Sequence, residues 1–113
     1  MPHIIVEYPD SISEQFNITA LLNNIHRSVV DSGLFDESHI KTRSYSFKDF
    51  TNAGGNEPYI HIQARIKSGR DDENKKMLSD TIINGLKLIN LPVAVVTVEI
   101  IDMDRKSYGK IKY

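Results

Sequence analysis

The chain has 113 residues, a length at which one hydrophobic core forms without crosslinks. It contains no cysteine, which excludes disulfides, thiol nucleophiles and thiolate metal ligands. Lys and Arg number 14 against 15 Asp and Glu, so the charge balance favours neither a nucleic-acid partner nor an acidic tail. Since no apolar run is long enough for a membrane span and the N-terminus lacks a signal-peptide pattern, we expect a soluble, cytoplasmic protein with no membrane partner.

The chain begins with a predicted strand and helix. Residues 3–8 are rich in β-branched and aromatic side chains and end at a Pro-Asp turn signal. Apolar residues then recur at helical spacing from Ile18 to Val29, and Gly33 suits the C-terminal cap. These patterns predict a strand followed by an amphipathic helix.

A second strand and a long loop follow. Residues 40–47 alternate, with Lys41 and Arg43 on the same face, which predicts a strand. Residues 49–58 contain two glycines, two asparagines and a proline, and they are too numerous for a tight hairpin turn. We therefore expect a flexible loop there.

The second half repeats the order strand, helix, strand. Residues 59–67 alternate cleanly between apolar and polar side chains, so one face must meet a core. Acidic residues at 71–73 favour a helix N-terminus, and apolar residues at helical spacing continue to Ile89 before Pro92 ends the helix. Residues 93–101 are apolar on both faces over most of their length, and two helices cannot cover both sides of the sheet. Another subunit is therefore expected to cover the second side.

This order is an architectural repeat. Residues 3–47 and 59–101 each form a strand-helix-strand unit of about 45 residues, the scale of a β-α-β unit with a right-handed parallel crossover. We expect residues 1–113 to be one α/β (α+β) domain, with duplicated β-α-β units, a four-stranded mixed sheet and two helices on one face. No regular element is predicted for 102–113, where Asp102, Asp104, Arg105 and Lys106 resemble a solvated charge cluster.

Pro2 is a candidate base. Initiator methionine is generally removed before a small residue such as proline, which would leave Pro2 as a secondary amine at the start of a strand. An α-amino group has an ordinary pKa of about 8, and apolar surroundings lower it further, toward the working pH that proton transfer requires. The alternative is that Pro2 has no catalytic role and is simply the residue between the initiator methionine and an ordinary edge of a strand.

The residues around Pro2 complete a family pattern. The segments MPHIIVE, SGLF, IKTRSYSF and HIQARIKSGRDDENKK resemble the 5-carboxymethyl-2-hydroxymuconate isomerases of the tautomerase superfamily, over residues 1 to about 100. The stretch IHIQARIKSGRDDENKKMLSDTI is also similar to a short 4-oxalocrotonate tautomerase subunit, which is itself one β-α-β unit. The resemblance thus accounts for the repeat.

The resemblance implies a homotrimer that isomerises a carboxylated dienol in the breakdown of aromatic acids, without metal or cofactor. Pro2 matches the general base, and Arg70 matches the position of a substrate-binding arginine. Arg43 and Lys41 lie on the strand that carries further basic residues of the family, although position 41 is lysine where relatives carry arginine. Lysine keeps the charge but loses the bidentate fork, which leaves the substrate's identity open.

Independently of the resemblance, Lys41 and Arg43 are candidates to hold carboxylates and stabilise a dienolate, and surface solvation is the alternative for each. The four histidines show no metal-ligand spacing, so structural roles are expected for them.

Three further possibilities stay open. A retained Met1 would convert the Pro2 nitrogen into an amide without basicity. The same element order also occurs in ferredoxin-like domains that bind small ligands without catalysis. A tautomerase acting on a smaller keto acid is a third reading, and strand order in the sheet separates the ferredoxin-like reading from the others.

Overall fold

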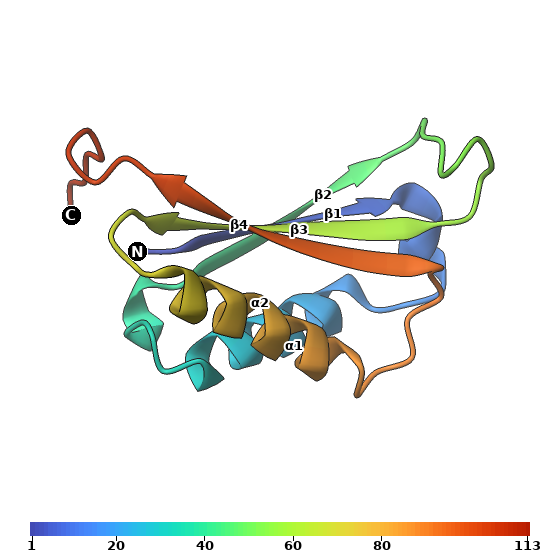
Figure 1. Ribbon diagram of the computed structural model, residues 1–113. Helices are drawn as coiled ribbons and strands as arrows, with labels where there is room; N and C mark the ends of the chain where they lie inside the picture. The colour runs from blue at the N-terminus through green and yellow to red at the C-terminus, as the bar shows by residue number, and fades with distance from the viewer.

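All residues, 1–113, are described in a computed structural model, whose single sheet carries both α-helices on one face (Figure 1). In chain order the main elements are β1 (His3–Pro9), α1 (Ile18–Asp31), β2 (Lys41–Phe47), β3 (Tyr59–Lys67), α2 (Asp72–Leu86) and β4 (Val95–Met103). Two short 3-10 helices, η1 (Asp10–Glu14) and η2 (Glu37–His39), were not predicted from the sequence. Neither α1 nor α2 combines the length and apolar character needed to cross a membrane.

The strand order of the sheet is β2-β1-β3-β4. β1 pairs with β2 in parallel, β3 pairs with β4 in parallel, and the two halves meet where β1 and β3 run antiparallel. Each half therefore pairs its own two strands directly, whereas a ferredoxin-like split unit has another strand between them. The predicted mixed sheet of duplicated β-α-β units is confirmed.

The core lies between the helices and one face of the sheet. Alternate residues of the two central strands, among them Ile4 and Val6 of β1 and Ile60 and Ile62 of β3, point toward the helices and are fully buried. Their neighbours in sequence occupy the opposite face, which no helix covers (Figure 1). This uncovered surface is called the open face below.

Each α-helix begins at a polar cap. The Asn17 side chain accepts a hydrogen bond from Ala20 N–H at 3.1 Å at the start of α1. The Asp71 side chain does the same for Asn74 N–H at 2.8 Å before α2. Because free N–H groups at a helix start need acceptors, these two residues fix where the helices begin.

The last part of the chain differs from the sequence prediction in three ways. α2 ends at Leu86 rather than near Ile89, because Leu88 and Ile89 donate to carbonyls three residues back and so tighten the chain into a turn. β4 runs from Val95 to Met103, and its open face carries Thr97 and Glu99, so it is not apolar on both faces. The predicted solvated charge cluster is partly wrong, since Asp102 lies within β4 with Lys75 Nζ at 3.1 Å.

The two helices approach closely at Gly85. A Cβ atom added to this residue would lie 2.1 Å from Ser28 Oγ and 3.4 Å from Ser28 Cβ. Ser28 is buried, and Asn24 Nδ2 of the same helix donates to Gly85 O at 3.1 Å. The absence of a side chain at Gly85 therefore sets the spacing of α1 and α2.

We predict that Gly85→Ala lowers the free energy of unfolding by about 1 to 2 kcal/mol, because overpacking outweighs the helix propensity gained by alanine. Adding Ser28→Ala should restore most of the loss, since it removes the clashing oxygen. Asn84→Ala, at an exposed position of the same helix, is the matched control and should change little. Urea denaturation followed by circular dichroism measures all four proteins, and a Gly85→Ala variant as stable as the parent would contradict the prediction.

Candidate functional site

Pro2 lies at the start of a central strand. Its side chain is fully buried, and its carbonyl accepts a hydrogen bond from Lys41 N–H at 3.1 Å, which extends the pairing of β1 and β2 to the chain terminus. Met1 precedes it and is partly exposed. The structure thus holds Pro2 in a fixed, apolar position.

Arg70 lies at the same end of the sheet, in the turn between β3 and α2. Gly69 before it has a φ of +123°, a conformation that L side chains rarely adopt. The Arg70 guanidinium donates a hydrogen bond to Leu34 O, and its Cζ lies 4.8 Å from the centre of the Phe35 ring. These contacts connect the second half of the chain to the loop after α1 and hold the cation in one place.

The basic residues of β2 lie on the open face. Arg43 Nη1 lies 3.2 Å from His3 Nδ1, and Arg43 Nε donates to Tyr45 Oη at 3.2 Å. His3 Nε2 in turn lies 2.8 Å from Tyr108 Oη of the C-terminal segment. Burial, and then the positive charges of Arg43 and Lys41, hold the pKa of His3 below its ordinary value, which favours the neutral ring.

A cavity of about 470 Å³ opens beside the chain terminus. It is lined by Met1, by the segment from Ser38 to Lys41, and by residues 108–113. Three lysines, Lys41, Lys110 and Lys112, line it, and no Asp or Glu side chain does. A cavity of this size and charge suits a small anionic ligand.

The positive charge acts on the terminal amine. Burial is the largest cause that lowers the pKa of the Met1 amine below its ordinary value, followed by the charges of Lys67, Lys110 and Arg70. A nearby cation disfavours the protonated amine because the two charges repel. The same end of the fold therefore favours a neutral, basic nitrogen.

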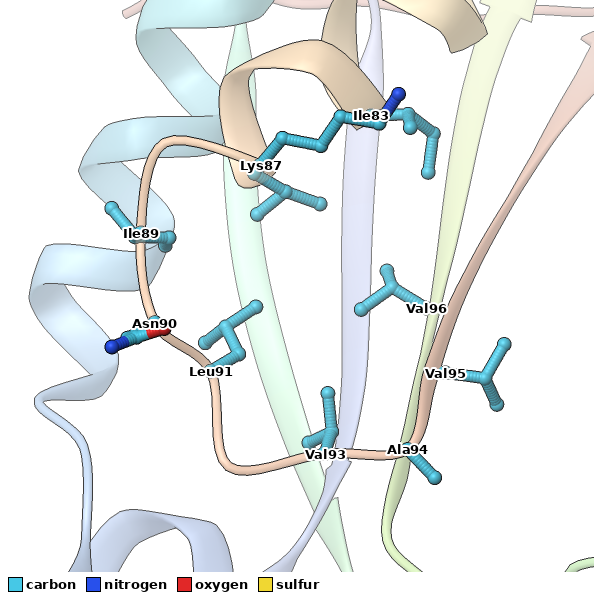
Figure 2. A pocket seen from close by; sticks show the side chains of 10 residues that line it. Ile83, Lys87, Ile89, Asn90, Leu91, Val93, Ala94, Val95 and Val96 are labelled. Atoms are coloured by element: carbon cyan, nitrogen blue, oxygen red, sulfur yellow. The ribbon is translucent and has the colours of Figure 1, made fainter.

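The other two cavities are less suited to an anion. One, of about 270 Å³, lies between the end of α2, the following loop and the start of β4, and Figure 2 shows Leu91, Val93 and Val96 pointing into it. Eight of its ten lining residues are hydrophobic, and it lies at the opposite end of the sheet from Met1 (Figure 1). The other, of about 510 Å³, is lined by Glu7 and Asp49, whose charges repel carboxylates.

The predicted site residues are therefore only partly brought together. Lys41 and Met1 line the cavity, whereas Pro2 and Arg70 do not, although the Arg70 charge acts on the Met1 amine. Arg43 does not line this cavity and instead contacts His3 and Tyr45 on the open face. Sequence reasoning missed the C-terminal residues 108–113, whose only signal was their basic, aromatic composition.

Two of the remaining histidines, His26 and His61, make ordinary side-chain contacts, and His39 lines the cavity beside Met1. His26 Nε2 lies 2.7 Å from Glu37, and His61 lies 2.8 Å from Glu99 and 2.7 Å from Thr97. No group of three or more His, Asp or Glu side chains has the arrangement of a metal site. Glu99 thus pairs with His61 across the two neighbouring strands β3 and β4.

Comparison with known proteins places this geometry in a family. Residues 2–100 match the family model described as 5-carboxymethyl-2-hydroxymuconate isomerase. The 5-carboxymethyl-2-hydroxymuconate Delta-isomerase of Escherichia coli is 26% identical over 89 residues, which cover 77% of this chain and 71% of that protein.

Solved structures show the same fold at low identity. A 5-carboxymethyl-2-hydroxymuconate isomerase from Deinococcus radiodurans R1 has a TM-score of 0.81 and 20% identity, covering 99% of this chain and 90% of its own. A fused 4-OT described as a symmetric trimer has a TM-score of 0.74 and 21% identity, covering 96% of this chain and 93% of its own. Since the family model spans nearly the whole sheet and both helices, the chain belongs to the 5-carboxymethyl-2-hydroxymuconate isomerase family.

Proposed function

We propose that the protein is a cofactor-independent isomerase that ketonises a carboxylated dienol such as 5-carboxymethyl-2-hydroxymuconate, as part of the breakdown of aromatic acids. The observation that carries this proposal is the cavity in which the terminal residue of the chain lies among lysines, with no acidic side chain lining it. A base and fixed cations are the two requirements of such a reaction. The name of the Escherichia coli relative supports the choice of substrate.

Pro2 is proposed as the general base, once Met1 has been removed. Its neutral secondary amine takes the proton of the enol hydroxyl, and the resulting ammonium returns a proton to a carbon of the conjugated system. No atom is gained or lost, because one proton moves from oxygen to carbon. Pro2 is buried, and burial together with nearby cations lowers the pKa of the preceding Met1 amine, which supports a neutral amine at this end of the chain.

Arg70, Lys41 and Arg43 are proposed to bind and polarise the substrate. Arg70 is held by Leu34 O and the Phe35 ring, so little conformational freedom is lost when it meets a carboxylate. Lys41 lines the cavity itself. Arg43 lies further away and contacts the cavity region through His3, so its contribution should be smaller.

A homotrimer is proposed as the functional assembly. The helices leave the open face uncovered, with Tyr45 and Val95 among its exposed side chains. Its polar side chains already pair within the sheet, as His61 does with Glu99, so the face is ordered before assembly. Two fused 4-OT structures of the same fold are described as symmetric trimers, which supports the same number of copies here.

The assembly is tested by sedimentation equilibrium. We expect a single species of three times the chain mass at micromolar concentration, because an interior made from three sheets would bury most of the open face. A monomer under these conditions would contradict the proposed trimer.

The role of the amine is tested by comparing protein with and without Met1. We expect Met1-free protein to isomerise a 2-hydroxymuconate-type dienol and the untrimmed form to be inactive, because an amide nitrogen has no basic lone pair. Pro2→Ala, also trimmed, keeps a primary amine and should lose only part of the rate. Mass spectrometry establishes which form each sample contains. Equal activity in a sample that keeps Met1 throughout would remove Pro2 from the mechanism and favour a non-catalytic ligand-binding protein.

The roles of the cations are tested by substitution. Arg70→Ala should lower kcat/KM for a dicarboxylate dienol by the equivalent of about 1.5 to 3 kcal/mol, the range for hydrogen bonds to charged groups, and Arg43→Ala by less. The kcat/KM of Arg70→Lys should lie between those of Arg70→Ala and the parent, since lysine keeps the positive charge but cannot donate two parallel hydrogen bonds to a carboxylate. Arg27→Ala, at an exposed position of α1, is the matched control. If both Arg70→Ala and Arg43→Ala leave the kinetics unchanged, these are surface residues without a substrate role.

A further inference from the structure

The C-terminal segment 104–113 forms one wall of the cavity beside the terminal amine. Residues 108–113 line the cavity opposite the segment from Ser38 to Lys41. Figure 1 shows this segment at the same end of the sheet as the N-terminus, although the two lie at opposite ends of the sequence. The family match ends at residue 100, so this wall lies outside the part of the chain that the family model describes.

Specific contacts hold the segment in place. Arg105 Nε donates to Ser68 O at 3.0 Å, and Arg105 N–H donates to Ser68 Oγ at 3.3 Å. Tyr108 Oη lies 2.8 Å from His3 Nε2, and Lys67 Nζ lies 5.1 Å from the centre of the Tyr108 ring. These contacts join the segment to β1 and to the end of β3, so the fold sets the positions of Arg105 and Tyr108.

The segment adds positive charge to the cavity. Lys110 and Lys112 line it together with Lys41 from β2, and no acidic side chain of the lining offsets them. Lys110 and Arg105 are also among the charges that act on the Met1 amine. Three lysines are more cations than one substrate carboxylate requires, and two of them come from the C-terminal segment.

Resting on the proposed function, we infer that the C-terminal segment is a specificity element, in which Lys110, together with Lys41, binds a carboxylate of the substrate remote from the reacting carbon. Arg70 is then left for the carboxylate next to the reacting enol. The preferred substrate class is a dienol or unsaturated keto acid with at least two separated carboxylates, and Tyr108 positions the wall through His3. A substrate with one carboxylate would leave Lys110 without a partner.

Binding is measured first, with probes that do not react. Adipate and hexanoate are six-carbon chains with two carboxylates and one, and protein-observed NMR titration gives the Kd of each for the Met1-free protein. We expect adipate to bind on the order of tenfold more tightly than hexanoate, since a charge-assisted hydrogen bond is added. Lys110→Met should remove most of this difference, whereas Lys106→Met, a charge in the same segment that does not line the cavity, should preserve it.

Kinetics provide the second measurement. For 2-hydroxymuconate, with a carboxylate at each end, Lys110→Met should raise KM on the order of tenfold with little change in kcat, because the contact is remote from the proton transfer. For the enol of phenylpyruvate, with one carboxylate, the same variant should behave as the parent. An effect on the substrate with two carboxylates but not on the substrate with one would show a loss of specificity, because a general disturbance of the fold would affect both substrates.

The two proposals fail differently. If the parent isomerises neither enol but adipate binding still depends on Lys110, the carboxylate site stands and the proposed isomerase function is wrong. If adipate binds the parent no better than hexanoate, or binds Lys110→Met as tightly as the parent, the specificity role of the segment is overturned whatever the activity. Equal losses in Lys106→Met and Lys110→Met would likewise overturn it, because they would reflect overall charge.

Discussion

The antiparallel pairing of β1 and β3 is the interaction on which the rest of the structure depends. It joins the two β-α-β halves through backbone hydrogen bonds and places both strands in the middle of the sheet. Because β1 is a central strand, its first residues are paired on one side with the start of β2 and on the other with the end of β3. A chain terminus, which ordinarily frays, is thereby held in place and buried at Pro2.

The same pairing decides which charges surround the terminus. The end of β3 leads into the turn that carries Arg70, and the start of β2 carries Lys41. The segment after β4 returns to this end of the sheet and adds Lys110. Cations from three separate stretches of sequence thus lie at the end of the sheet that carries the terminal amine, while the acidic residues Glu7 and Asp49 line a different cavity. Lys and Arg nearly balance Asp and Glu over the whole chain, so net charge does not single out the proposed site. The site is distinguished by the unequal distribution of positive and negative side chains along the sheet.

The fold was largely predictable because local patterns and the repeat agreed. The clean alternation of residues 59–67 and the helical spacing of Ile18 to Val29 were confirmed as β3 and α1. The end of α2 was not, because the turn after Leu86 is stabilised by backbone bonds that side-chain periodicity does not report. Residues 93–101 were expected to be apolar on both faces over most of their length, and the structure shows that Thr97 and Glu99 both fall on the open face of β4.

The site was less predictable than the fold. The short motif around Arg70 and the position of Pro2 were visible in the sequence, and their roles are proposals that the geometry supports. The C-terminal wall was not visible, because its place depends on contacts between residues far apart in the chain, such as that of Tyr108 with His3. From sequence alone, a basic C-terminal segment is expected to be exposed to solvent, and only the tertiary structure shows which surface it covers.

Proton transfer by Pro2 requires the fold to keep its amine neutral, and so able to accept a proton, at the working pH. The most direct test is an NMR titration of Met1-free protein labelled with ¹⁵N at proline, with the pKa of the Pro2 amine compared between native protein and protein unfolded in urea. We predict a lower pKa in the native state, because burial and the charges of Lys67, Lys110 and Arg70 already lower the pKa of the Met1 amine, and Pro2 is the next residue and is buried. A native pKa equal to or above the unfolded value would contradict the claim.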